Sequence, residues 1–208
     1  MDPEFHVTSQ RLYISHLLAS NDSHCDFLVQ LWNTPEFTKS CGKTKVRTRE
    51  DACKEISGRF LEDHTRNGYG IYLVSLRASS EDVEDYQSKS FQEISSQSKP
   101  NGTVSLMRGK PPTAFTAPDL GFAILPEETR KGYAREASQA LMDHVESALG
   151  VPDILGLFDP QNKASEAVFR SLQFQDCGVK NLQEFGGLPV AIWVKAGMSQ
   201  DVSLYRLK

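Results

Sequence analysis

The chain has 208 residues, 39% of them hydrophobic and 24% charged, with a formal net charge of −4 and a pI near 5.8. This length fits one domain better than two, and the acidic balance excludes the basic footprint of a nucleic-acid-binding protein. No apolar run approaches the roughly 20 residues of a membrane-spanning helix, and the first twenty residues lack a secretory signal pattern. The four cysteines form no Cys-x-x-Cys pair, which argues against a zinc or other metal site and predicts a cytoplasmic protein.

Two segments stand apart from the rest of the chain. Residues 1–5, Met-Asp-Pro-Glu-Phe, resemble translated vector linker, so we expect a single domain at residues 6–208. Residues 79–101 are rich in Ser, Glu, Asp and Gln and are too polar to bury much surface. They predict a mobile insertion between two hairpin strands.

The first half of the chain is predicted to hold one strand, two helices and a second strand. Alternation of polar and apolar residues indicates a strand at 11–15. Asp22 or Ser23 is expected to cap a helix, on which His24 should be exposed. Thr48 opens a capping box, and the helix that follows it should stop at Gly68, a residue suited to a left-handed end.

The second half alternates strands with two helices. This order favours a mostly antiparallel sheet with one crossover between parallel strands. Further strands are predicted at 70–77, 102–108, 120–125, 154–159, 175–179, 190–195 and 202–207, and helices at 132–149 and 164–172.

A basic turn lies between the strand at 120–125 and the helix at 132–149. The first four N–H groups of a helix have no partner within it, and with the helix dipole they attract anions such as phosphate. Gly132 permits close approach of the backbone to a ligand, and Ala134 leaves room beside it. The alternative is an ordinary helix start with solvated basic residues. Those basic residues are Arg130, Lys131 and Arg135.

This turn and the strand before it resemble the coenzyme A signature of GNAT acetyltransferases, in particular the ribosomal-protein N-terminal alanine N-acetyltransferase (Rim-type) branch. The family turn Q/R-x-x-G-x-G/A is matched by residues 129–134, with Thr129 at its first position. A second family motif, D-P-x-N-x-x-S followed by V-x-x-x-x-G-F, is matched by residues 159–174, with Gln173 at the glycine. The start, Thr8-Ser9-Gln10-Arg11-Leu12, resembles the branch's T-x-R-L with one inserted residue.

The resemblance implies the GNAT fold, an α/β (α+β) domain. Its sheet is mixed, mostly antiparallel and twisted, split in a V near the cofactor strand, and carries helices on both faces. Acetyl-CoA is implied as co-substrate, with pantetheine between the strands at 120–125 and 154–159. The alternative for Asn162 and Ser165 is a loop cap and a helix N-terminal cap, and Asn162 is expected to serve both as a cap and as a cofactor ligand. The cofactor-binding residues implied by the resemblance are Ile124, Leu125, Arg130, Lys131, Gly132, Tyr133, Ala134, Arg135, Asn162 and Ser165.

Acetyl transfer to an amine needs a neutral amine, donors for the oxyanion and a proton for the thiolate. Asp119 is the first candidate base, because many GNAT enzymes carry a carboxylate at the start of the cofactor strand. The alternative for Asp119 is a solvated carboxylate at a strand edge. Glu36 is the second candidate, since this branch lines its acceptor site there.

The remaining catalytic groups also follow from the resemblance. Phe169 occupies the position at which many GNAT proteins carry a proton-donating Tyr. Ser165 therefore takes over the role, proposed in the Rim-type branch, of helping to protonate the thiolate. The oxyanion donor is expected to be a backbone N–H near Ile124 or Leu125.

These inferences predict an N-acetyltransferase that moves the acetyl group of acetyl-CoA to a primary amine by direct attack in a ternary complex. The acceptor is a peptide N-terminus or a small-molecule amine, and the chain is a monomer or homodimer without nucleic-acid or membrane partners. The alternative is a coenzyme A-binding regulatory or interaction module with little or no turnover. Phe169 and Thr129 motivate that alternative, because both depart from the wider family pattern.

Overall fold

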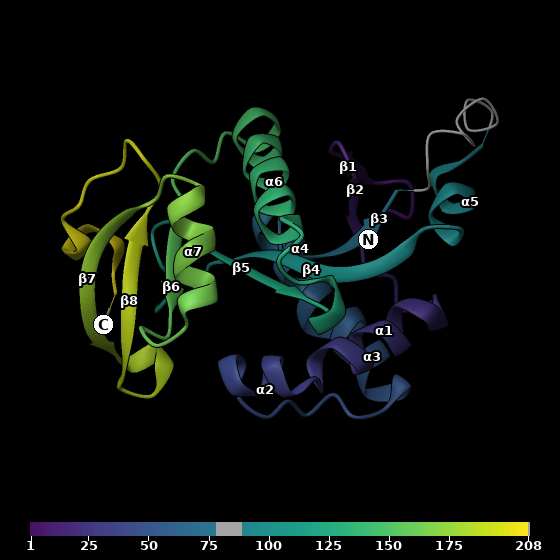
Figure 1. Ribbon diagram of the computed structural model, residues 1–208, viewed down its shortest axis with the longest axis horizontal. Coiled ribbons are helices and arrows are strands. Elements are labelled where there is room, and N and C mark those ends of the chain that lie inside the picture. Colours follow the sequence, from purple (N-terminus) through teal and green to yellow (C-terminus); the bar gives the residue numbers. More distant parts are fainter. Residues whose placement is uncertain (78–88, 208) are drawn as a thin grey trace. The chain divides into compact units, whose positions relative to one another are not determined.

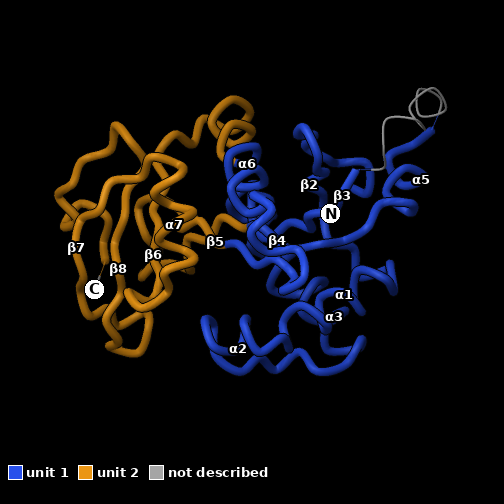
Figure 2. The backbone as a smooth tube through the Cα atoms, in the orientation of Figure 1, with its two compact units in different colours: residues 1–104, 122–141 blue, residues 105–121, 142–208 orange. Residues whose placement is uncertain are grey.

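A computed structural model describes residues 1–77 and 89–207. It contains an eight-stranded, mostly antiparallel sheet with the strand order β1-β2-β3-β4-β5-β6-β8-β7, which confirms the predicted mixed α/β class (Figure 1). The chain divides into two compact units, one of residues 1–104 and 122–141 and the other of residues 105–121 and 142–208 (Figure 2). Within the described ranges, no helix has the length and apolar character to cross a membrane.

Three elements contribute residues to both units. They are β4 (Lys99–Met107), β5 (Asp119–Ile124) and the 17-residue helix α6 (Tyr133–Leu149). Between β5 and α6 lies a short 3-10 helix, η3 (Pro126–Glu128).

The N-terminal strands of the first unit are antiparallel. They are β1 (His6–Thr8), β2 (Leu12–His16) and β3 (Ile71–Leu76). In the ladder, β2 places Ile14 opposite Val74, and both side chains are fully buried. The strands predicted at 11–15 and 70–77 are therefore confirmed within one residue.

A helical layer joins β2 to β3. It consists of α1 (Asp22–Trp32), α2 (Pro35–Cys41), α3 (Arg49–Glu55), the π-helical segment η1 (Ile56–Phe60) and α4 (Leu61–Asn67). The capping box at Thr48 is present, and Gly68 ends α4 in the left-handed region at φ +80°.

Two details at the start of this layer differ from the prediction. Asn21 caps α1 with its side-chain oxygen, so neither Asp22 nor Ser23 is the cap. The helix α2 was not predicted. Thr34 caps it and Pro35 stands at its first position, where a missing N–H costs nothing, so the proline begins a new helix immediately after α1.

The two segments set apart in the sequence both contact the first unit. Phe5 stacks on His16 with ring centroids 4.4 Å apart. Of the predicted insertion, residues 79–88 lie outside the described residues, while the remainder forms α5 (Phe91–Ser96) and the start of β4. Phe91 is buried. Its ring supplies the apolar surface that the rest of this polar segment lacks.

Two of the four cysteines come together in the helical layer. α1 packs against α3, and this brings the Sγ atoms of Cys25 and Cys53 within 2.7 Å. Burial, and then the hydrogen bond with Cys53, raise the pKa of the Cys25 thiol to about 12. The pair therefore arises from helix packing, since no spacing in the sequence indicates it.

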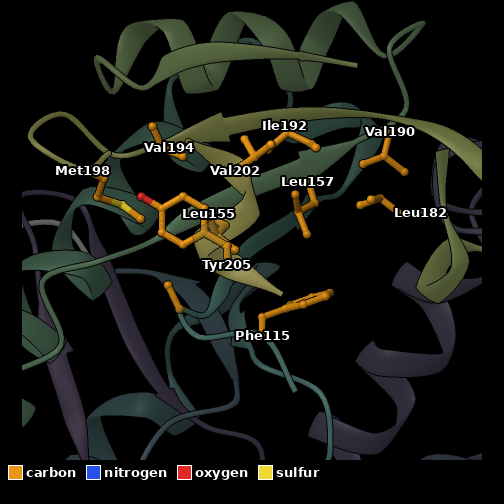
Figure 3. Packing of buried hydrophobic residues seen from close by; sticks show 11 residues of the cluster. Phe115, Leu155, Leu157, Leu182, Val190, Ile192, Val194, Met198, Val202 and Tyr205 are labelled. Carbon is orange, nitrogen blue, oxygen red and sulfur yellow. The ribbon is translucent and has the colours of Figure 1, made fainter. Parts of the chain in front are cut away.

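The second unit is built on β6 (Leu155–Phe158), α7 (Lys163–Ser171), β7 (Gln175–Leu182) and β8 (Leu188–Val194). β8 is antiparallel to both β6 and β7. The 3-10 helix η4 (Gln183–Phe185) connects β7 to β8. Buried side chains from these strands, from the segment before β5 and from the C-terminal segment form one core (Figure 3). Its labelled members are Phe115, Leu155, Leu157, Leu182, Val190, Ile192, Val194, Met198, Val202 and Tyr205.

The predicted strand at 202–207 is wrong. Val202–Tyr205 is a 3-10 helix, η5, capped by the Asp201 side chain. A 3-10 helix places residues three apart on one face, so Val202 and Tyr205 both reach the core. The Tyr205 hydroxyl donates to the Ser199 carbonyl at 2.6 Å, which ties the segment to the loop before it.

The expectation that His24 is exposed is also wrong. Its side chain is buried, and its Nδ1 accepts a hydrogen bond from the Leu18 N–H at 3.1 Å. Burial lowers the pKa of His24 to about 4. The imidazole is therefore neutral in the folded chain at neutral pH, with its proton on Nε2.

His24 should make folding sensitive to acid. The unfolded His titrates near pH 6.5, so between about pH 6.5 and 4 the unfolded state binds a proton that the folded state excludes, and stability falls as pH falls. Between pH 7 and pH 5 the expected loss is about 2 kcal/mol in the free energy of unfolding. His24→Asn keeps an acceptor for Leu18 and cannot titrate. Urea unfolding at pH 7 and pH 5 should show a smaller difference for this variant, and equal differences would contradict the assignment.

Candidate active site

The turn before α6 has two residues in the left-handed region. Arg130 has φ +61° and Gly132 has φ +85°. Such an alternation of backbone conformations turns successive N–H groups toward one side and forms an anion-binding concavity. Apart from its two chain neighbours, the one described group within 4 Å of a Cβ atom at Gly132 would be the Arg11 guanidinium, at 3.4 Å. The turn is therefore open at Gly132, at the N-terminus of a long helix.

β4 and β5 approach each other closely just before this turn. A Cβ atom at Gly102 would lie 2.5 Å from the carbonyl oxygen of Ala123, so only glycine fits there. The Leu125 N–H donates to the Asn101 carbonyl at 2.9 Å. This contact is a correction to the predicted oxyanion donor, because the Leu125 N–H is already used within the sheet.

The side chain of Lys131 is also engaged. Its ammonium donates to the buried carboxylate of Glu128 at 2.8 Å, and Lys99 donates to the same carboxylate at 3.0 Å. These hydrogen bonds, first from Lys131 and then from Lys99, lower the pKa of Glu128. Lys131 therefore offers a ligand its backbone N–H more readily than its charge. Arg130, Lys131 and Arg135 are all exposed.

The N-terminal segment holds the turn from the other side. Arg11 Nε donates to Glu136 Oε2 at 2.7 Å, and Arg11 Nη1 donates to the Lys131 carbonyl at 3.0 Å. The Ser9 hydroxyl and the Arg11 backbone N–H both donate to Glu136 Oε1 at 2.7 Å. The Arg11 guanidinium also lies over the Tyr133 ring, 4.6 Å from its centroid.

Asp119 begins β5 and binds the neighbouring strand through its side chain. β5 and β6 are parallel, with Asp119 opposite Leu155, and the Leu155 N–H donates to the Pro118 carbonyl at 2.8 Å. One step further, the Leu157 N–H donates to Asp119 Oδ1 at 2.8 Å, so a carboxylate takes the place of a backbone carbonyl. Asp119 is thus not a solvated carboxylate at a strand edge.

The surroundings of Asp119 disfavour its charged form. Burial raises its pKa well above the usual value, and the hydrogen bond from Leu157 opposes this shift only in part. The residue as a whole keeps some accessible surface, but its carboxyl group is set among protein atoms. A carboxylate with a raised pKa is a stronger base than an exposed one, which keeps Asp119 a candidate.

The second motif forms the start of α7. The Asn162 side-chain oxygen accepts from the Ser165 N–H at 3.0 Å, so Asn162 is the cap of this helix. Ser165 is half-buried in the first turn. The structural explanation of Asn162 is confirmed, and contacts of either residue with pantetheine or the thiol stay a prediction.

Phe169 is a core residue of the second unit. Its ring stacks on Phe158 and packs edge-on against Phe174, with centroids 5.1 Å apart in each pair. Gly156 faces it so closely that a Cβ atom there would lie 2.5 Å from the ring. The aromatic ring at position 169 therefore packs in the core, and its side chain has no group that can donate a proton to a thiolate.

Glu36 lies exposed in the first turn of α2, beside the stacked rings of Trp32 and Phe37.

Sequence reasoning missed the polar contacts that hold the turn before α6. These contacts come from Ser9, Arg11, Glu128 and Glu136. The resemblance of residues 8–12 to the family's start contains the signal for two of them, Ser9 and Arg11, but a match at the start of the chain does not indicate which distant residues it contacts.

Comparisons with known proteins identify the family of the chain. The family model described as "Acetyltransferase (GNAT) domain" matches residues 11–175. Ribosomal-protein-S5-alanine acetyltransferase from Vibrio fischeri superposes with a TM-score of 0.68 at 16% identity, covering 92% of this chain and 96% of that one. No curated protein matches the chain.

Two further solved structures are similar. An acetyl transferase from Salmonella typhimurium, which modifies the N-terminal serine of ribosomal protein L7/L12, has a TM-score of 0.65 at 18% identity and covers 92% and 98% of the two chains. The L7/L12 acetyltransferase RimL in complex with coenzyme A has a TM-score of 0.65 at 19% identity and covers 92% and 97%. The family match spans most of the chain, and the left-handed turn into α6 lies inside it. The chain belongs to the GNAT acetyltransferase domain family.

Proposed function

We propose that this protein is an acetyl-CoA-dependent N-acetyltransferase that passes the acetyl group directly to a primary amine in a ternary complex. The observation that carries the proposal is the left-handed turn at Gly132, which opens a 17-residue helix within the matched family domain. Bound acetyl-CoA would supply an activated thioester. The chain's own residues would bind and orient it and would manage the protons.

The residues of the turn fit a pyrophosphate. The backbone N–H groups of residues 130–135 are the proposed donors, because a helix N-terminus and a left-handed turn both favour anions. Arg130 and Arg135 add exposed positive charge. Asn162 and Ser165 are proposed to contact the pantetheine amides and the thiol end, and the Ile124 N–H is the remaining proposed oxyanion donor.

The acceptor is proposed to be a peptide N-terminus. The similar enzymes from Vibrio fischeri and Salmonella typhimurium act, by their names, on ribosomal proteins, and this class of acceptor is the first to test. Acetyl-CoA should be incubated with a panel of N-terminal peptides and small amines while release of the coenzyme A thiol is followed. Measurable cofactor binding with no transfer to any amine would favour the second candidate, a coenzyme A-binding module. The observation that supports this candidate is the buried Phe169 ring, which has no acidic group to protonate a thiolate.

Asp119 is proposed as the base, and its replacement separates chemistry from folding. Asp119→Asn keeps an oxygen for the Leu157 N–H and removes a costly buried charge, so the melting temperature should not fall. Turnover should decrease by at least about tenfold, while the Kd for acetyl-CoA stays constant. In the parent enzyme, kcat/KM should fall as pH falls through the raised pKa of Asp119.

The turnover of two further variants is compared with that of Asp119→Asn. Ser165→Ala should cost less turnover than Asp119→Asn, because water can replace a weakly acidic hydroxyl. Glu36→Gln should leave turnover near the parent value. Full turnover of Asp119→Asn across pH 6–9 would remove Asp119 from the mechanism, and a loss in Glu36→Gln would then identify the base.

A further inference from the structure

We propose that Arg11 is a positioning residue that holds the pyrophosphate turn in its binding conformation through Glu136 and the Lys131 carbonyl. This inference rests on the proposed function. All of the groups that carry it lie in the first unit, so its geometry is contained within one compact part of the chain.

The guanidinium contacts residues on both sides of Gly132. Before Gly132, Arg11 Nη1 donates to the Lys131 carbonyl at 3.0 Å. After it, the guanidinium lies 4.6 Å from the centroid of the Tyr133 ring and pairs with Glu136 through Nε and Nη2, each at 2.7 Å. A glycine at φ +85° is the most easily deformed point of a turn. Fixing its two neighbours limits that freedom.

Arg11 also neutralises a charge in an unfavourable place. Glu136 lies in the first turn of α6, where a phosphate would bind, and only about 16% of its side chain is exposed. Burial raises its pKa, but hydrogen bonds from Ser9 and from the backbone and side chain of Arg11 outweigh this and leave the pKa lowered. Glu136 is therefore ionised at neutral pH and would repel a phosphate if Arg11 did not pair with it.

The geometry sets this pair apart from an ordinary surface ion pair. Isolated exposed pairs contribute little, because solvent screens them and two long side chains must be ordered. Here Nε and Nη2 of the guanidinium both bind Glu136 Oε2, and Glu136 Oε1 accepts from the backbone N–H of Arg11 and from the Ser9 hydroxyl. The segment just before β2 is thus attached to the start of α6 at several points.

The test compares two acetyl donors that differ in the group bound by the turn. Acetyl-CoA carries the pyrophosphate, and S-acetylpantetheine lacks it. In Arg11→Met, the KM and Kd for acetyl-CoA should rise roughly tenfold or more, because hydrogen bonds from the turn to the charged pyrophosphate contribute strongly to binding. The kcat/KM for S-acetylpantetheine should stay unchanged. Partial unfolding would lower activity with both donors equally, so the ratio between donors reports positioning alone.

Three further variants sharpen the comparison. Arg49→Met is the matched control, because the ion pairs of Arg49 are with Asp22 and Asp26 of α1, in the helical layer. It should leave the ratio unchanged. Arg11→Lys keeps the charge but lacks the separate nitrogens that bind Glu136 and the Lys131 carbonyl, so it should recover only part of the acetyl-CoA affinity. Adding Glu136→Gln to Arg11→Met should also recover part, because it removes the uncompensated negative charge.

The outcomes distinguish this inference from the proposed function. If the parent protein binds and uses acetyl-CoA, and Arg11→Met keeps the parent ratio of acetyl-CoA to S-acetylpantetheine efficiency, the positioning role is refuted and the function stands. An equal loss with both donors would also refute it, because that result indicates a general folding effect. If the parent protein does not bind acetyl-CoA, the proposed function itself fails.

Discussion

Replacing Gly132 with tryptophan is expected to weaken acetyl-CoA binding by roughly a hundredfold or more. At φ +85°, any L side chain is strained, and the Cβ atom of one would already lie 3.4 Å from the Arg11 guanidinium. The turn would relax, and at least two backbone N–H groups would lose their phosphate partners. A hydrogen bond to a charged group is worth about 1.5–3 kcal/mol, so two lost contacts account for that factor. Isothermal titration calorimetry with acetyl-CoA measures it directly.

Gly178 provides the matched control for this experiment. It also has a positive φ, +90°, with open space within 4 Å of the position that a Cβ atom would take, and it lies in β7 of the second unit. Gly178→Trp carries the same backbone strain and should bind acetyl-CoA like the parent chain. Unchanged affinity in Gly132→Trp would remove the turn from the cofactor site, and an equal loss in both variants would attribute the effect to strain alone.

Replacing Gly156 with valine should destabilise the chain by at least about 3 kcal/mol, a large effect for overpacking. A Cβ atom at Gly156 would lie 2.5 Å from Phe169 Cε1 and 2.8 Å from two other ring carbons. The ring cannot move aside, because Phe158 stacks on it and Phe174 packs against its edge. In a chain of this length, the melting temperature should fall by roughly 6–12 °C, which differential scanning calorimetry can follow.

A smaller side chain at position 169 should rescue part of this loss. In the Gly156→Val background, Phe169→Leu should cost less than it does alone, because it frees the space that valine needs. Gly58→Ala is the control, since Gly58 lies in a helical segment where an added Cβ atom would have open space around it to 4 Å. It should change stability by no more than about 1 kcal/mol. Additive effects of the two substitutions at positions 156 and 169 would show that the contact is not the cause.

Local signals in the chain were sufficient for most of the secondary structure. The capping box at Thr48 and the glycine stop at Gly68 depend on a few neighbouring residues, and both are present. The failures occurred where tertiary contacts outweigh local pattern. Residues 202–207 have the composition of a strand, but the core requires Val202 and Tyr205 on one face, which a 3-10 helix provides.

The candidate site divides in the same way. The strand, turn and helix around Gly132 could be identified from the residues, because the conformation of a glycine turn and the anion affinity of a helix N-terminus are local properties. The state of Asp119 could not, because burial by the folded chain raises its pKa, and the hydrogen bond that opposes this in part comes from the Leu157 N–H, 38 positions away. The hydrogen bond of the Leu125 N–H could not be predicted either, because its acceptor is a backbone carbonyl of the adjacent strand.

By itself, the sequence determined the family, the order of most elements and the location of the turn, since each of these is written in short runs of neighbouring residues. Only the tertiary structure decided which side chains hold that turn. Arg11 and Glu136 are separated by 125 positions and meet because the residues just before β2 lie against the first turn of α6. No periodicity or spacing in the sequence indicates a contact of this kind, because it forms only when distant segments fold onto one another.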